Sequence, residues 1–496
     1  MWHPWKHRKL IGANPEGAEY LGRSRALFKP IVDSLRPLVL LIDAELTQKD
    51  VTDPKTKYLL EPAAVLPIQA HLYSKTGPPL HHPKIAAIGS GIRAHEGWAV
   101  AEVSSEWWYA GATIVRSGTP EFIPMRIDAS EAAWLRQQFS LEGSTNADID
   151  ADLRVLLTAK AIRADFYVTE RPLTVNVLPE YWRNTEVLSS HQALPIVGLY
   201  LRSLDHYVYS QRPPIGSTRI FQPETVYRDR STFFYQASRA LLPYYFAWSS
   251  AYNRFCDLQG VASKSPDSES ILWRINQAIR SRDRLLRQLS VVPIEHAPVD
   301  DILSELDQIL IYLNAAFDIS ARVAHQTQSG KGSQYSAGWL KEDWIGSLSN
   351  SSELQATLSK GSDGCKLLWI LSRFRNQIHE TAFSGGGTIF VAGPNTLDPM
   401  FPIPEDLKNE VLSYMDSLGG RDAWGVKGEF MGRIWIHPGD FAEQLLSRSL
   451  PLLSSIMSQT RIGESNTRHV NKDELREPLS PHEQRLIWQL GIEESP

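Results

Sequence analysis

The sequence has little cysteine, no apolar run of membrane length and no excess of basic residues. Its only cysteines, Cys256 and Cys365, exclude a multi-bridge disulfide framework and a four-cysteine zinc site. The apolar run Pro37 to Ile42 is far too short to cross a bilayer. The basic start MWHPWKHRKL lacks the apolar region of a signal peptide. We therefore expect a cytoplasmic protein from a reducing compartment, with no membrane partner.

The charge balance excludes a global attraction to nucleic acid. The formal net charge is −5 over 496 residues, so any binding to a polyanion must rest on a local cluster of basic residues. The length allows two or three domains with sizeable cores. The 15 Trp, 17 Tyr and 16 Phe residues argue against disorder.

An early stretch, Arg36 to Gln48, predicts a buried strand that ends in acidic residues. Its apolar run Leu38 to Ile42 is followed directly by Asp43 and Glu45. Binding sites of parallel sheets gather at the carboxyl ends of the strands, so Asp43 is a candidate site residue. The alternative is a solvated turn at the end of the strand.

A second acidic pattern occupies Asp148 to Leu173. It predicts a short amphipathic helix with Asp152 near its start, followed by the strand DFYVTE, which Glu170 ends. Asp43, Asp152 and Glu170 each lie at the edge of a predicted element, where a fold could bring them together. Converging carboxylates bind Mg²⁺ or Mn²⁺. The alternative is again that these side chains are solvated.

Residues 36 to 180 resemble the metal-dependent nucleases of the PIN-like class. The similar features are the early strand-end acid, the later aspartate that opens a helix, and a strand that ends in Val-Thr and an acid. The resemblance implies an α/β domain with a parallel sheet, and a metal site formed by the three acids named above. The family's middle acid is not identifiable here, with Glu102 and Glu106 as candidates, and the last acid is glutamate instead of the usual aspartate.

The Pro/Gly-rich segment Gln211 to Ser217 is the predicted domain boundary. Beyond it the periodicity is helical. We expect an α/β domain over residues 30–210, an all-α helical bundle over residues 225–460 and a polar tail over residues 461–496. Amphipathic helices are predicted, with a kink at Pro243 in the first, over residues 231–255, 271–290, 300–325, 366–383 and 441–459.

The predicted helix over residues 271–290 is rich in arginine. Asp283 is its only acid against Arg274, Arg280, Arg282, Arg284 and Arg287. These arginines could follow a phosphate backbone, and the alternative is a solvated arginine face.

The stretch Lys366 to Gly387 holds the most chemically informative constellation. Its apolar stripe, which predicts a helix, consists of Leu367, Ile370, Leu371, Phe374 and Ile378. Arg375, Asn376 and His379 flank that stripe as helix-surface neighbours. Three glycines then end the helix.

The sequence SRFRNQIHE within a predicted helical bundle resembles the HEPN class, which includes metal-independent ribonucleases and toxins. The family motif is an arginine, often followed by a polar residue, and then a histidine after four to six intervening residues. Arg373 leaves five residues before His379, whereas the Arg375-Asn376 pair fits the polar pattern but leaves three. The resemblance covers roughly residues 230 to 460. It implies RNA as the partner, and it allows a site formed across a homodimer.

The chemistry implied by this resemblance needs no metal or cofactor. The 2′-hydroxyl of RNA attacks the adjacent phosphate, His379 moves a proton near neutral pH, and Arg373 or Arg375 stabilises the charge on the phosphoryl oxygens. The alternative is that Arg375 and His379 pair with carbonyls or with acids of the bundle, such as Glu380 or Asp318.

The sequence thus predicts a two-domain ribonuclease, toxin-like or defensive, that uses Arg373, Arg375, Asn376 and His379. Two alternatives stay open. One is a metal-dependent nuclease that uses the N-terminal acids. The other is a non-catalytic scaffold that binds RNA or a protein. Sensitivity to a chelator separates the two enzymes.

Overall fold

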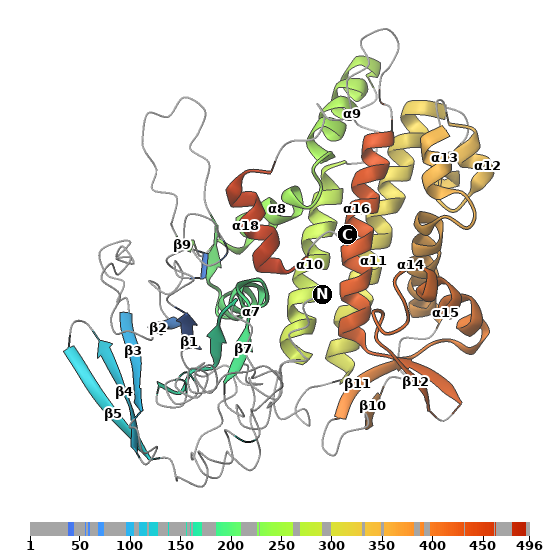
Figure 1. Ribbon diagram of the computed structural model, residues 1–496. Helices are drawn as coiled ribbons and strands as arrows, with labels where there is room; N and C mark the ends of the chain where they lie inside the picture. The colour runs from blue at the N-terminus through green and yellow to red at the C-terminus, as the bar shows by residue number, and fades with distance from the viewer. Residues whose placement is uncertain are drawn as a thin grey trace, which may run out of the picture. The chain divides into compact units, whose positions relative to one another are not determined.

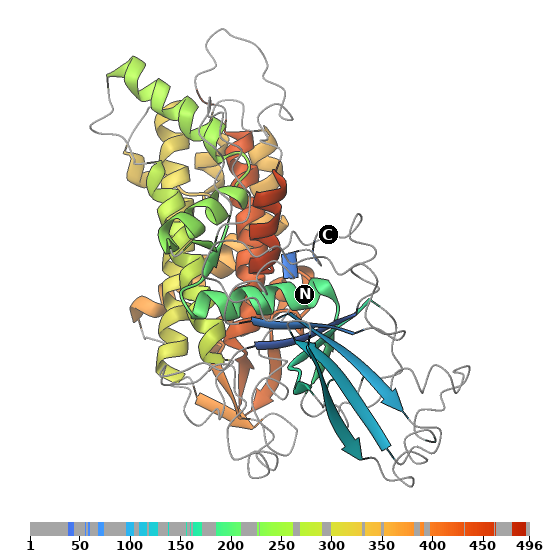
Figure 2. The same ribbon diagram turned by 90° about the vertical axis from the view of Figure 1, so that its left-hand side faces the viewer.

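The computed structural model (Figures 1 and 2) is mostly helical, with a parallel sheet in its N-terminal part. The chain divides into two compact units. Unit 1 comprises Met1–Arg228, Ser290–Pro293 and Trp488–Gly491, and unit 2 comprises Asp229–Leu289, Ile294–Ile487 and Ile492–Pro496. The structure describes residues 38–43, 55, 58–59, 68–73, 96–103, 109–116, 119–126, 137, 155, 159, 162–170, 185–209, 226–227, 229–260, 268–289, 299–329, 333–348, 352–380, 387–390, 397–430, 432–460, 462 and 479–492.

The strands of unit 1 form a sheet in the order β5-β4-β3-β2-β1-β6-β7, whose arrows run from blue through teal to green in Figure 2. All neighbours from β3 to β7 are parallel, and β4 and β5 extend the sheet as an antiparallel hairpin. The strands are β1 Leu38–Asp43, β2 Ile68–Tyr73, β3 Glu96–Val103, β4 Tyr109–Arg116, β5 Thr119–Arg126, β6 Phe166–Val168 and β7 Glu186–Leu188. The strand order reverses at β1, so the carboxyl ends of β1 and β6 flank a topological switch point, where sheets of this type commonly bind ligands.

Strand β1 confirms the strand predicted within Arg36 to Gln48. Its side chains at Leu38, Leu40, Leu41 and Ile42 are fully buried, as expected for a central parallel strand covered on both faces. Strand β6 likewise matches the predicted DFYVTE strand. The following helix α7, Ser190–Ser203, begins with a capping box between Ser189 and Gln192. The antiparallel pair β8 Tyr207–Val208 and β9 Val226–Tyr227 completes the described strands of this unit.

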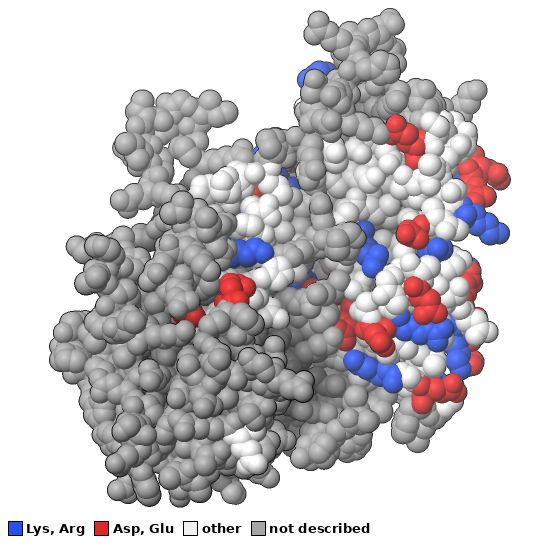
Figure 3. All heavy atoms as spheres, in the orientation of Figure 1, with Lys and Arg blue, Asp and Glu red and all other residues white. Residues whose placement is uncertain are grey.

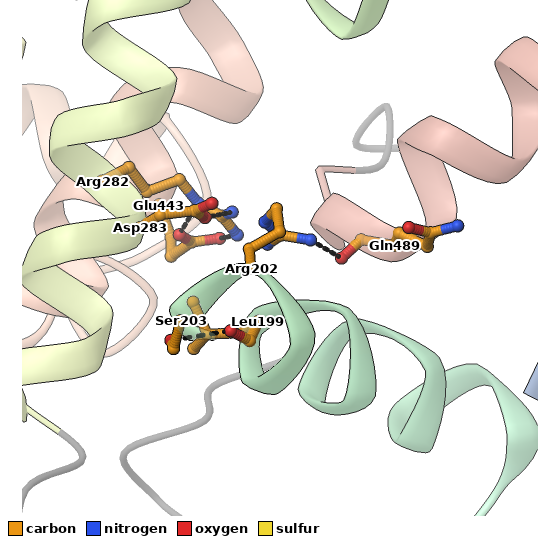
Figure 4. A network of polar contacts seen from close by, with 7 residues as sticks. All are labelled: Leu199, Arg202, Ser203, Arg282, Asp283, Glu443 and Gln489. Carbon is orange, nitrogen blue, oxygen red and sulfur yellow. Dashed lines mark hydrogen bonds and ion pairs between the residues drawn. The ribbon is translucent and has the colours of Figure 1, made fainter. Parts of the chain in front are cut away.

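The segment predicted as a polar tail contains a helix, α18, Pro481–Leu490, whose last residues belong to unit 1. The Arg202 guanidinium donates from Nη1 to the Gln489 carbonyl oxygen at 3.0 Å (Figure 4). The Trp488 ring lies 5.9 Å from the Tyr58 ring and 5.1 Å from the Lys55 ammonium. The prediction of a polar tail missed this helix, because its short apolar stripe follows a long polar stretch of sequence.

Unit 2 is built on long helices. Helices α10 and α11 pack side by side as a hairpin (Figure 1), and α11 also packs against α14 and α16. The predicted kink at Pro243 is a full break between α8 and α9. The described helices are α8 Arg230–Ala240, α9 Tyr245–Gln259, α10 Glu269–Leu289, α11 Val299–Ala324, α12 Glu342–Gly346, α13 Ser352–Leu358, α14 Asp363–Glu380, α15 Lys408–Ser417 and α16 Pro438–Gln459. None of the described helices combines the length and hydrophobicity that a membrane span requires.

The unit is mostly helical but not all-α, so that part of the prediction was wrong. An antiparallel sheet in the order β10-β11-β13-β12 lies between α14 and α16 in the chain. Its strands are β10 Gly387–Phe390, β11 Leu397–Pro402, β12 Val426–Phe430 and β13 Arg433–Ile436. Gly432, with a φ of 73°, lies in the turn from β12 to β13. Strands this short give too little alternation to be recognised within a Gly- and Pro-rich stretch.

A buried ion pair joins two of these helices. Arg282 of α10 has no exposed surface. Its Nη2 donates to Oε2 of Glu443 on α16 at 2.8 Å, and its Nε donates to Oε1 of the same carboxylate (Figure 4). Asp283 lies 3.5 Å from Nη1. Another arginine of α10, Arg284, donates to Glu305 at 2.8 Å. The predicted arginine face of this helix is therefore divided between internal ion pairs and surface residues, and it does not form one track for phosphates.

We expect Glu443→Gln to lower the free energy of unfolding by about 3 kcal/mol, because it leaves the buried guanidinium with only the more distant carboxylate of Asp283 as counter-charge. The double variant Arg282→Met/Glu443→Leu should recover most of this loss. Equilibrium urea unfolding of the full chain measures both. The matched control is Glu305→Gln, whose partner Arg284 is partly exposed, and which should cost less than about 1 kcal/mol. Equal losses at Glu443 and Glu305 would contradict the buried role.

A second stability prediction concerns Asp307 of α11. Burial raises the pKa of this carboxyl to about 6 from 3.8. Between these two values the unfolded chain has lost the proton and the folded chain still holds it, so wild-type stability falls as the pH rises from about 4 to about 6. Asp307→Asn should remove that fall and be more stable than wild type by about 1 kcal/mol at pH 7, allowing for the half-exposed side chain. Parallel pH dependences of the two proteins in urea unfolding would refute the prediction.

Candidate functional site

Helix α14 has the amphipathic character that the sequence predicts. The side chains of Leu367, Ile370, Leu371 and Phe374 are buried. The Phe374 ring lies 6.0 Å from the ring of Phe401 and 4.9 Å from that of Phe441. This packing fixes the rotation of α14 about its axis and so determines which of its polar residues face outward.

The predicted site residues lie on the outward side of α14. Arg373 and Asn376 are exposed and Arg375 is half-buried. The Arg375 guanidinium donates from Nη1 to Oδ1 of Asn376 at 3.1 Å, and the Arg373 guanidinium lies 5.4 Å from the centre of the Trp369 ring. His379 belongs to the last turn of α14, but its side chain is outside the described residues, as is that of Glu380.

Helix geometry decides which arginine shares a face with His379. At about 100° per residue, Arg375 and His379 are separated by about 40° around the axis, and Asn376 lies within about 100° of Arg375. Arg373 is turned by about 120° from His379. The family spacing favours Arg373, whereas the helix groups Arg375, Asn376 and His379 and leaves Arg373 beside Trp369.

The positive charges of four side chains from different segments, Arg375 among them, act on one carboxylate of unit 2. This carboxylate belongs to Asp318, on the exposed side of α11. Partial loss of hydration raises the pKa of Asp318, and the positive charges of Arg322, Arg375, Arg274 and Lys341 act in the opposite direction. Arg322 shares α11 with Asp318, Arg375 is on α14, Arg274 is on α10 and Lys341 precedes α12. The fold therefore brings together charges that are far apart in the sequence.

We name this group the Asp318 cluster, which consists of Arg274, Asn314, Asp318, Arg322, Lys341 and Arg375. Asn314 donates from Nδ2 to Oδ2 of Asp318 at 3.1 Å. Within the described part of the chain, the four cations form no ion pair within 4.0 Å. With four positive charges and one negative charge, the cluster keeps a local excess of three.

This excess is local. On the face shown in Figure 3, positive and negative side chains alternate over the described surface of the α12 to α15 region. Asp318 was one of the acids expected as an alternative partner for Arg375. The structure places it near Arg375 but shared among four cations, without a close ion pair. The sequence pattern showed Arg375 and missed Arg322 and Lys341, because nothing in their local spacing marks them.

In unit 1, two of the three predicted metal-binding acids lie at the same edge of the sheet. Asp43 ends β1 and is buried. Its Oδ2 accepts hydrogen bonds from the hydroxyls of Tyr167 at 3.1 Å and Thr169 at 3.0 Å. Glu170 follows β6, and its Oε1 accepts from the backbone N–H of Ser190 at 2.9 Å, which suits an acid at the start of α7. The described donors thus already use both carboxylates.

The remaining acids of that prediction are not described. Asp152 and Glu106 lie outside the described residues, and Glu102 lies in β3 with its side chain undescribed. Among the side chains that the structure does describe, no three of His, Cys, Asp or Glu converge as metal ligands. The metal site for Mg²⁺ or Mn²⁺ therefore stays a prediction.

Comparison of the chain with family models, with curated proteins and with solved structures finds no significant match. The resemblances to the PIN-like and HEPN classes therefore rest on the sequence patterns alone and stay predictions.

We expect Asp43→Ala to destabilise the protein by about 1 to 3 kcal/mol, because the Tyr167 and Thr169 hydroxyls lose a buried acceptor. The loss should be the same in EDTA and in excess MgCl₂ or MnCl₂. Thermal unfolding measures it, with Thr169→Val as the control that removes only one donor. A metal-dependent rise in the wild-type Tm that Asp43→Ala abolishes would contradict this role and support a metal site.

Proposed function

We propose that unit 2 cleaves RNA without a metal ion, at a site formed by Arg375, Asn376 and His379 with Arg373 nearby. The observation that carries the proposal is the excess positive charge around Arg375. A phosphodiester is a common biological anion that suits a site where positive charges exceed negative charges by three, on a helix whose sequence also includes His379. The absence of a metal requirement follows from the use of the substrate's own 2′-hydroxyl as nucleophile.

The proposed reaction is an internal transesterification. The 2′-oxygen forms a bond to the adjacent phosphorus, and the bond from phosphorus to the 5′-oxygen breaks. One imidazole removes the 2′-hydroxyl proton, and a protonated group supplies a proton to the leaving 5′-oxygen. Arg375 stabilises the charge that develops on the phosphoryl oxygens, and Asn376 orients it through the 3.1 Å hydrogen bond. The products are a 2′,3′-cyclic phosphate and a 5′-hydroxyl.

Two copies of His379 would supply both proton-transfer groups if two motifs faced each other in a homodimer. A single motif offers one imidazole, which would have to act first as base and then as acid. The dimer is therefore part of the proposal, and cleavage should fall at dilutions that separate the protomers.

A second candidate is an RNA-binding protein that does not cleave. The spacing of Arg375 and His379 favours it, because three residues separate them where the family motif has four to six. The Asp318 cluster would then hold the RNA backbone without any proton transfer.

Cleavage of a mixed RNA pool, in the presence and absence of EDTA, tests the proposal. We expect cleavage in EDTA. It should fall about 100-fold or more in His379→Ala and by about 100- to 1000-fold in Arg375→Ala. Arg373→Ala should lose less than about tenfold, because this residue lies on another side of the helix. The cyclic phosphate ends should be detectable by mass spectrometry of the products.

The controls for this experiment are Asp152→Ala and Asp43→Ala, which should cleave as wild type does in EDTA. RNA with 2′-O-methyl groups should resist cleavage. Cleavage that requires Mg²⁺ and Asp152 would move the site to unit 1. A folded wild type that binds RNA but does not cleave it, as a monomer or a dimer, would favour the second candidate.

A further inference from the structure

Exposed aromatic side chains lie on the helices that carry the Asp318 cluster and on the segment that follows α11. Trp273 of α10 is 53% exposed, and Tyr335, beyond the end of α11, is 73% exposed. Ile311 of α11 is also exposed, at 38%. Large rings that stay open to water beside cations are available to contact a partner.

The Trp273 ring packs against a second aromatic ring of unit 2. Its ring lies 5.7 Å from that of Tyr312 on α11, in a T-shaped arrangement. Its sequence neighbour Arg274 belongs to the Asp318 cluster, and the Nε atom of Arg274 is buried without a hydrogen-bond partner in the described structure. Trp273 and Arg274 are therefore consecutive residues of α10, about 100° apart around its axis.

The Tyr335 ring is held in a similar way. The guanidinium of Arg322, another member of the cluster, lies 5.1 Å from its centre. The segment that carries Tyr335 is anchored on α11 by Trp339, whose Nε1 donates to the Phe317 carbonyl at 3.1 Å and to Ser320 Oγ at 2.8 Å. The exposed Tyr335 ring therefore belongs to a segment that hydrogen bonds attach to α11, and it contacts the Arg322 guanidinium.

Tyr312, which contacts Trp273, and Arg322, which contacts Tyr335, both belong to α11. Tyr312 and Arg322 are ten residues apart, about 15 Å along the helix, and Asp318 lies between them. That length corresponds to about four phosphates of one nucleic-acid strand at its stacked spacing of about 3.4 Å. The α11 residues that contact the two rings therefore lie within the length of a short single strand.

We propose that this surface binds single-stranded nucleic acid, with bases stacked on Trp273 and Tyr335 and the intervening phosphates held by Arg274, Arg322 and Arg375. Stacking on aromatic rings combined with a cationic groove is how single strands are bound without reading their sequence. A duplex buries the faces of its bases, so it would use the cations and not the rings. The site shares Arg375 with the proposed cleavage site, but binding does not depend on cleavage.

Asp318 has a distinct part in this proposal. Its carboxylate lies among the cations that would hold a phosphate, so it repels the ligand. Asp318→Asn should therefore bind the strand several-fold more tightly, whereas loss of any cation should weaken binding. A surface that merely needs Asp318 for its structure would show the opposite effect.

The test is fluorescence anisotropy of a labelled single-stranded RNA of roughly twelve nucleotides, within the site sizes of single-strand binders. The full chain is used in EDTA and with His379→Ala in every protein, so that the RNA stays intact. Trp273→Ala and Tyr335→Ala should each weaken binding about tenfold or more and leave the affinity for duplex RNA unchanged. Arg274→Gln and Arg322→Gln should weaken both, and each should reduce the slope of log Kd against log salt by about one.

Two matched controls separate the site from general surface effects. Tyr235 of α8 is 47% exposed and makes none of the contacts described for the cluster, so Tyr235→Ala should bind as the parent does. Substitution of Arg421, which pairs with Asp416 at 2.8 Å, controls for the loss of one positive charge and should also bind as the parent does. Circular dichroism confirms that each variant is folded.

The outcomes are distinguishable from those of the cleavage experiment. Equal affinity for RNA and DNA strands would show recognition of bases and phosphates alone, and a preference for RNA would add a contact to the 2′-hydroxyl; both support the proposal. Binding without cleavage would support it while refuting the proposed enzyme. Unchanged affinity for the single strand in folded Trp273→Ala and Tyr335→Ala would overturn the proposal. Displacement of the strand by polyglutamate at the same concentration of negative charge would also overturn it, because it would show that charge alone determines binding.

Discussion

The buried pair between Arg282 and Glu443 is the constraint on which the geometry of the helical unit depends. Both side chains are removed from water, so neither helix can slide or rotate without leaving a charge unpaired in the core. Arg282 therefore fixes α10 against α16, and it does so about 12 Å along α10 from Arg274. On the same helix, Ser281 and Arg284 contact Gln308 and Glu305 of α11. The surface positions of Trp273 and Arg274 thus follow from polar contacts made deeper in the unit.

A chain with a net charge of −5 can still present a cationic site if the fold concentrates its positive charges. The Asp318 cluster does this with residues from α10, α11, α14 and the segment before α12, which span Arg274 to Arg375. No window of the sequence contains more than a fraction of these charges. The described α12 to α15 surface alternates in sign (Figure 3), so the field of the cluster is felt at short range, and other polyanions are not drawn to the protein as a whole.

The periodicity of apolar residues predicted those helices and strands whose pattern lies within one short stretch of the sequence. The apolar run before Asp43 and the stripe from Leu367 to Ile378 predicted β1 and α14, because each pattern is contained in a short stretch of the chain. The sequence could not give the partner of a long-range contact. Arg282 looked like one member of a solvated arginine face, since Glu443 is 161 residues away. The sheet β10 to β13 and α18 were missed because short elements between Gly, Pro and polar residues carry weak patterns. The sequence pattern identified the residues of the candidate site on α14, but it did not identify Arg322, Lys341 or Tyr335.

The carboxylate of Asp318 affects the stability of the ligand-free protein and the proposed binding of a phosphate in opposite directions. Without a ligand, four cations around one point repel each other, and a carboxylate among them lowers that repulsion in the folded protein. A phosphate bound as proposed would take over the same role with more charge and more acceptors, and the carboxylate would then weaken its binding. Asp318 is already partly dehydrated, and its pKa is raised in spite of the cations, so its own stabilising effect is modest. The arrangement is what is expected of a binding surface in which some stability is given up to keep the cations unpaired for a ligand.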